Sequence, residues 1–142
     1  MQKYIGTKII EAEPCKAWKD TKLHKAGEDG YKVRYPDGYE SWSPKDVFEE
    51  AYRPTDCMSF GLAIEAMKKG KKVARRGWNG KNQHIELATR ISYMTAEGVF
   101  MNVEHEAIGN KAIAFCGTSG VQMGWLASQA DMLADDWEIV EA

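Results

Sequence analysis

The chain has 142 residues, the size of one ordinary domain or of two small modules. Hydrophobic residues make up 44% and aromatic residues 11%, which is enough apolar material to fold and argues against disorder. The net charge of −2 argues against a dedicated nucleic-acid binder. No apolar run approaches the roughly 20 residues that span a bilayer, and residues 1–10 lack a signal-peptide pattern, so we expect a non-exported protein that does not enter a membrane.

The first 56 residues predict a small β-rich module with one short helix. Tyr31, Val33 and Tyr35 alternate with charged residues, which is the period of a half-buried strand. The turn residues at 36–38 then favour a hairpin. We expect strands over 4–13, 31–35 and 39–42, a loop over 16–29, and a helix that begins with Ser43 as the N-cap and Pro44 as the first helical residue.

Residues 57–142 predict a second module, in which a mostly antiparallel sheet is combined with two short helices. Ser59 is expected to cap the first helix, which has apolar residues at helical spacing and ends near Gly70. Ser128 is expected to cap the second helix, with Asp131 three residues on. Strands are predicted over 72–76, 84–94, 100–105, 112–116, 121–125 and 137–140. The second helix is predicted to have an apolar stripe made of Ala130, Leu133, Ala134 and Trp137. The fold class that follows is α+β.

The near-neutral net charge hides a strong asymmetry along the chain. Residues 57–90 contain eight basic and two acidic side chains, a net charge of +6, whereas residues 91–142 contain one lysine and eight acidic side chains, a net charge of −7. Residues 1–56 carry a net charge of −1. Such a chain can present a local positive site without being basic overall.

The positive segment leads directly into a turn with the residues of a nucleotide site. Arg76 offers a planar fork for phosphate, Trp78 a flat face for a base, and Asn79 a paired donor and acceptor. The alternative is a tight turn with Trp78 in the core and a solvated edge strand carrying the lysines. The polar side chains of Ser128 and Asp131 could likewise contact ribose hydroxyls or a base edge.

Motifs for metal binding and catalysis are weak. Cys15, Cys57 and Cys116 are widely spaced and form no C-x-x-C pair, so neither a disulfide framework nor a zinc site is expected, and a reducing cytoplasm fits best. His84 and Glu86 alternate along an expected strand and could converge on one face, but two ligands do not make a site. We therefore expect no metal, no cofactor and no catalytic residues.

Three motifs together resemble the Thoeris anti-defense 2 family of phage and prophage proteins. They are Met58-Ser59-Phe60-Gly61, the run Lys71-Lys72-Val73-Ala74-Arg75-Arg76-Gly77-Trp78-Asn79-Gly80, and the run from Trp125 to Trp137 that reads WLASQADMLADDW. The resemblance covers about residues 57–140 and leaves the first module, residues 1–56, outside it. It implies a homotetramer with ligand pockets between subunits, acting in the cytoplasm of the infected bacterial host.

The resemblance also implies a function. Such proteins are non-catalytic sponges that bind cyclic ADP-ribose isomers made by a bacterial TIR-domain enzyme, and some members sequester cyclic dinucleotides. By motif, the ligand-binding residues expected here are Arg76, Trp78, Asn79, Ser128 and Asp131. Two other classes stay open: an enzyme that degrades such signals, for which His84, Glu86 or His105 would be needed, and a basic accessory module that binds nucleic acid or protein.

Overall fold

The chain divides into two compact units, which are described separately below. The computed structural model describes residues 1–78, 80, 82–102 and 111–141, and the units are Met1–Arg53 and Pro54–Ala142. Each unit combines antiparallel strands with short helices, so the predicted α+β class is confirmed. Within the described ranges, no helix is both long and apolar enough to cross a membrane.

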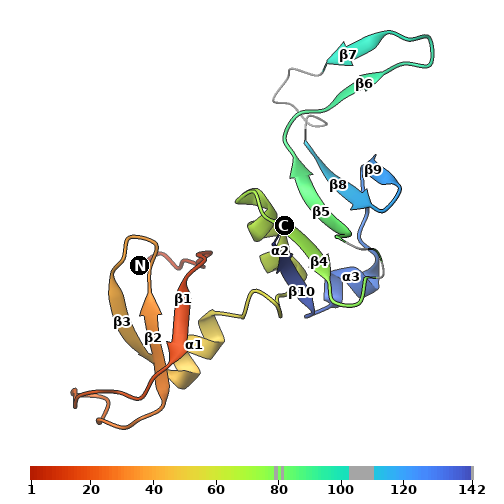
Figure 1. Cartoon of the computed structure of the whole chain (residues 1–142). Helices are drawn as coiled ribbons and strands as arrows, with labels where there is room; N and C mark the ends of the chain where they lie inside the picture. Colours follow the sequence, from red (N-terminus) through yellow and green to blue (C-terminus); the bar gives the residue numbers. More distant parts are fainter. Residues whose placement is uncertain (79, 81, 103–110, 142) are drawn as a thin grey trace. The chain divides into compact units, whose positions relative to one another are not determined.

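The N-terminal unit is a three-stranded antiparallel sheet with one helix (Figure 1). Its elements are β1 (Glu11–Pro14), β2 (Gly30–Arg34), β3 (Glu40–Pro44) and α1 (Lys45–Ala51), in the sheet order β1-β2-β3. Val33 on the central strand is 1% exposed. Gly30 is required where β2 meets β3, because a Cβ there would collide with the Ser43 carbonyl and the Trp42 ring.

Two predictions for this unit are wrong in detail. Residues 4–10 form no strand, and only Glu11–Pro14 pairs with β2, because the apolar residues before it find no core: Ile5 is 98% exposed. Helix α1 begins at Lys45, with Pro44 at the N-cap position and no side-chain cap. Ser43 and Pro44 instead continue β3, where they pair with Tyr31 and Gly30.

The C-terminal unit is built on a five-stranded antiparallel sheet in the order β10-β4-β5-β8-β9. A separate two-stranded sheet is formed by β6 and β7. The elements are α2 (Phe60–Lys68), β4 (Lys72–Arg75), β5 (His84–Ala88), β6 (Ser92–Met94), β7 (Phe100–Asn102), β8 (Ala112–Gly117), β9 (Gly120–Met123), α3 (Gln129–Leu133) and β10 (Trp137–Val140). Helix α2 packs against β10, β4 and β5 (Figure 1).

Helix α2 forms where the sequence predicts it and supplies one side of the core. The Ser59 hydroxyl accepts the Leu62 N–H at 3.3 Å, and Gly70 ends the helix with a φ of +85°, a conformation that glycine adopts without strain. The buried residues of the helix, Ala63, Ala66 and Met67, pack in one cluster with Met58, Val73, Ile85 and Trp137. Trp137 is the largest side chain in the described core, and it is fully buried.

Three sequence predictions for this unit need correction or lie outside the described residues. The strand expected over 84–94 is two strands, β5 and β6, interrupted by a bend at Thr89 and Arg90. Leu133 is 77% exposed and does not belong to an apolar stripe facing the core, because α3 is too short to bury a full face. The predicted strand at 100–105 is described only over Phe100–Asn102, and His105 lies outside the described residues.

The packing predicts that truncation to alanine lowers the free energy of unfolding very differently at two aliphatic positions of the sheet. Truncation of fully buried Ile85 to alanine should lower the free energy of unfolding by about 2–5 kcal/mol, because it leaves a cavity between α2 and the sheet. Val121→Ala, at a residue that is 65% exposed, should change it by less than about 0.5 kcal/mol. Chemical denaturation of the full chain measures both, and equal losses would contradict the assigned core.

Candidate ligand-binding site

A pocket of about 400 Å³ lies where the two sequence motifs meet in the C-terminal unit. Its walls come from the turn after β4, the residue before β5, strand β8 and the segment that leads into and through α3. The lining residues are Gly77, Trp78, Gln83, Phe115, Trp125 and Asp131. The volume falls within the range of about 300–1,000 Å³ that is usual for small-molecule sites.

Aromatic rings form the apolar wall of this pocket. The ring centroid of Trp78 lies 5.6 Å from that of Phe115 and 6.1 Å from that of Trp125. Behind them, the ring of buried Trp137 lies 5.5 Å from Trp78 and 6.2 Å from Trp125, with both pairs in edge-to-face geometry. Trp78 is therefore half-buried: one side packs on the core, and the ring also borders the pocket. The sequence left open whether Trp78 is a core residue of a tight turn or a flat face for a ligand, and its position is compatible with both.

Asp131 forms the acidic part of the wall and is fixed from three directions. Its Oδ2 accepts the Ser128 backbone N–H at 2.9 Å, while its own N–H donates to the Ser128 hydroxyl at 3.1 Å, which completes the capping box of α3. Its Oδ1 lies 3.1 Å from Nη1 of Arg75. Its carbonyl accepts the indole N–H of Trp137 at 2.9 Å. The carboxylate position is thus set by α3, β4 and the core together.

Arg75 is held in an ion-pair network and is not available as a phosphate ligand. Besides Asp131, it binds Asp136, with Nε 3.0 Å from Oδ1 and Nη2 3.3 Å from Oδ2. These two carboxylates, Asp136 first, raise the pKa of Arg75. The pKa of Asp131 is lowered: burial acts to raise it, but the hydrogen bonds from Ser128 and the Arg75 guanidinium outweigh burial. Asp131 is therefore ionised at neutral pH.

The structure brings together some of the residues predicted from sequence. Trp78 and Asp131, which are far apart in the chain, both line the pocket. Ser128 is exposed and caps α3 through the same bonds that hold Asp131. Arg76 is exposed and donates from Nη2 to the Asp56 carbonyl, although the next residue, Gly77, lines the pocket. Asn79 lies outside the described residues.

Four lining residues were not among the binding residues predicted from the sequence. Gly77 and Trp125 belong to the recognised motifs, whereas Gln83 and Phe115 belong to no recognisable motif. Phe115 lies on β8, and Gln83 directly precedes β5; β5 and β8 are neighbours in the sheet. The Gln83 Oε1 accepts the Gly80 N–H at 2.8 Å, which ties it to the turn that carries Trp78. Alternation of apolar residues predicts a strand over 112–116, but it does not predict which strand pairs with it.

Comparison with known proteins agrees with this assignment of motifs. Residues 58–140 match the family described as the Thoeris anti-defense 2-like domain, and the match covers more than half of the chain. The chain therefore belongs to the Thoeris anti-defense 2-like family, as the motifs predicted. The match coincides closely with the C-terminal unit, Pro54–Ala142.

A curated relative supports the same family. The protein named Thoeris anti-defense 2 of Bacillus phage SP01 is 38% identical to the chain over 86 residues. The aligned part is 58% of this chain and 94% of the relative. Membership of this family supports a phage anti-defense role for the chain.

The pKa of Asp131 gives a pH prediction. Because the pKa is lowered in the folded state, the carboxylate stabilises the fold above the unfolded value of about 3.9, and this contribution is lost as the pH falls through the folded pKa. Asp131→Asn should therefore be less stable than the wild type at pH 7, and the difference should shrink as the pH falls below about 4. Urea denaturation across this pH range measures it. The control is Asp135→Asn, at an exposed carboxylate. If the difference in unfolding free energy between Asp131→Asn and the wild type does not change with pH, the ion-pair network around Asp131 is contradicted.

Proposed function

We propose that the C-terminal unit is a non-catalytic sponge, which binds a cyclic ADP-ribose-type signal and thereby blocks Thoeris-like immunity. Cyclic dinucleotides are the second ligand class that we propose. The observation that carries this proposal is the pocket in which Trp78, Phe115 and Trp125 surround a space bordered by Asp131 and Gln83. Membership of the anti-defense family supports the same role.

The aromatic wall suits a nucleobase. Stacking of a base on an aromatic side chain contributes about 1–3 kcal/mol and tolerates different bases, because every base has a flat π face. Trp78 and Trp125 lie in edge-to-face geometry at 64°, so a base stacked on one ring would turn its own edge toward the face of the other. This arrangement positions a planar ligand without requiring one particular base.

The polar wall suits ribose hydroxyls and base N–H groups rather than phosphates. An ionised Asp131 accepts hydrogen bonds from donors and repels anions. We therefore propose that the phosphates of the ligand lie away from Asp131, near the Gly77 backbone and the Arg76 side chain. Asn79, which lies outside the described residues, is proposed as a further ligand residue from its motif alone. The capping residue Ser128 is proposed to act through the position of Asp131.

The energetics are sufficient for a stoichiometric sponge. A ligand of about 35 heavy atoms that gains roughly 0.3 kcal/mol per atom binds with on the order of 10 kcal/mol, which corresponds to a Kd near the nanomolar range. A sponge works by mass action, so it needs an affinity of this order and no turnover.

We also propose that the chain is a homotetramer. Apolar side chains are exposed within the run from Trp125 to Trp137: Leu126 is 88% exposed, Met132 42% and Leu133 77%. Such a group is typical of a surface that is covered by another protein chain. Light scattering coupled to size-exclusion chromatography should give four times the chain mass, and Leu126→Glu combined with Leu133→Glu should lower it. A monomer for the wild type at micromolar concentration would contradict this proposal.

The role of the pocket is tested by a tryptophan substitution. Trp78→Leu should weaken binding of a cyclic ADP-ribose isomer by about 10-fold or more, because it removes a stacking face. Isothermal titration calorimetry measures the Kd. The matched control is Trp18→Leu in the N-terminal unit, at a tryptophan that is 58% exposed, and it should bind like the wild type.

Because Trp78 also packs on the core, a second variant keeps the test independent of folding. Gln83→Ala removes a polar pocket group and leaves the aromatic cluster intact. Its Kd should rise by several-fold, with a cooperative thermal transition retained. The same titration, applied to Arg76→Ala and Asn79→Ala, tests the proposed phosphate side. Unchanged affinity in Trp78→Leu and Gln83→Ala would contradict binding in this pocket.

A further inference from the structure

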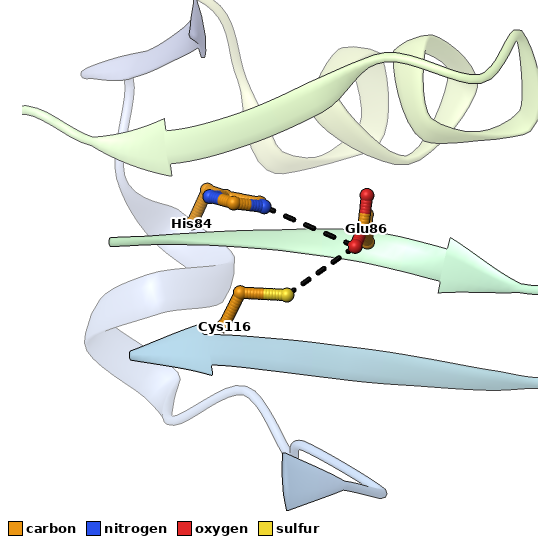
Figure 2. Close-up of side chains that lie close together, drawn as sticks. All are labelled: His84, Glu86 and Cys116. Atoms are coloured by element: carbon orange, nitrogen blue, oxygen red, sulfur yellow. Dashed lines mark hydrogen bonds and ion pairs between the residues drawn. The ribbon is translucent and has the colours of Figure 1, made fainter. Parts of the chain in front are cut away.

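Three side chains with metal-ligating atoms converge on the sheet of the C-terminal unit. Figure 2 shows His84 and Glu86 on β5 and Cys116 on β8. The Cys116 Sγ lies 3.3 Å from the Glu86 Oε1, and the His84 Nε2 lies 3.9 Å from the same oxygen. All three ligand atoms lie within 4.8 Å of one another. This cluster is separate from the residues that line the pocket.

The register of the sheet explains why these residues meet. His84 and Glu86 are two residues apart on β5, so their side chains leave the same face of the strand. Cys116 is the direct antiparallel partner of His84, which brings the third group to that face from β8. The partner of Glu86 is Ala114, whose small side chain leaves the space between the groups open.

The orientation of His84 is that of a histidine that coordinates a metal. Its Nδ1 lies 2.6 Å from the Asn82 carbonyl, so Nδ1 donates a hydrogen bond there, and in the neutral imidazole Nε2 then presents its lone pair. Nε2 is buried and has no hydrogen-bond partner among the residues that the structure describes. Metal-bound histidines usually donate their other ring N–H to a carbonyl or carboxylate, which fixes the tautomer. Here the backbone carbonyl of Asn82 supplies that contact.

Without a metal, the cluster is only partly satisfied. The Cys116 thiol donates to the Glu86 carboxylate, but the His84 Nε2, at 3.9 Å from the same oxygen, is too far from it for a hydrogen bond. Burial raises the pKa of the Cys116 thiol, Glu86 acts in the same direction, and Lys72 opposes them. A cation with an affinity for nitrogen, sulfur and oxygen would satisfy all three groups at once.

We propose that His84 Nε2, Glu86 Oε1 and Cys116 Sγ bind one zinc ion, with a water molecule as the fourth ligand. Zinc takes nitrogen, sulfur and carboxylate ligands in tetrahedral geometry, with ligand atoms about 3.3–3.6 Å apart for bond lengths near 2.0–2.3 Å. The distances in the cluster need to change by only about 1 Å to reach this geometry. On binding, the Cys116 thiol loses its proton to solvent and the sulfur forms the bond to zinc.

The proposed ion would join two strands that also form the pocket wall. Gln83 and Phe115, which line the pocket, are the direct sequence neighbours of His84 and Cys116. Zinc would therefore hold β5 and β8 in register at the point where they present these two side chains. Glu86, whose side chain is 41% exposed, gives the ion a route from solvent.

Zinc itself is the probe for this proposal. The full chain is stripped with a chelator and titrated with zinc chloride by calorimetry, and we expect one zinc per chain with release of a proton. Cobalt(II) in place of zinc should give a thiolate-to-cobalt charge-transfer absorption. Cys116→Ser should lose this absorption and bind zinc at least about 10-fold more weakly, and Glu86→Gln should bind zinc more weakly but keep the absorption.

Cys57→Ser is the matched control, because Cys57 is an exposed cysteine in the same unit, and it should retain both zinc binding and the absorption. Zinc should also raise the Tm of the wild type, and it should raise the Tm of Cys116→Ser less. Magnesium should not produce this difference between the two proteins. The proposal is overturned if the stripped chain binds no stoichiometric zinc, or if Cys116→Ser keeps the affinity and the absorption of the wild type. Neither readout depends on nucleotide binding, so this test is distinct from that of the pocket.

Discussion

The ion pair between Arg75 and Asp131 is the interaction on which the architecture of the site depends. It connects β4 to α3, and the same aspartate caps that helix and accepts the indole N–H of the buried Trp137. Because both charges are partly buried and hydrogen-bonded, removal of one partner would leave the other poorly satisfied. The pocket is therefore shaped by the same bonds that attach α3 to the sheet, so its polar wall is preorganised before any ligand arrives.

This constraint changes the interpretation of the positive segment. The sequence places six basic residues at positions 68–76, which could form either an anion site or a solvated helix end and edge strand. In the structure Arg75 is neutralised by Asp131 and Asp136, and Lys68 lies 3.5 Å from Glu65. Arg75 of the basic segment is thus paired with two carboxylates of the acidic segment, whereas Lys68 pairs with a glutamate of its own segment. What the pocket presents is aromatic surface with one carboxylate, and this is the basis of the proposal that it holds the base and ribose of a nucleotide rather than its phosphates.

Local features were predictable from sequence, and those that depend on strand partners were not. The Ser59 and Ser128 caps, the hairpin after β2 and the strand at Trp137–Val140 follow from spacing and turn residues. Trp78 and Asp131 were recognised through their motifs. Gln83 and Phe115 in the pocket, and Cys116 beside His84, required the pairing of β5 with β8, which hydrophobic alternation does not specify. The strand predicted over 4–13 forms only from Glu11 onward, because strand propensity alone does not supply residues 4–10 with a partner or a core.

One measurement tests both whether the pocket holds a nucleotide signal and whether that signal stays unconverted. The purified chain is mixed with a limiting amount of a cyclic ADP-ribose isomer, separated from free ligand, and denatured by heat, and the released small molecule is identified by chromatography and mass spectrometry. The ligand should co-purify with the protein and be released intact in stoichiometric yield. Release of a cleaved or isomerised product, or no retained ligand, would contradict it.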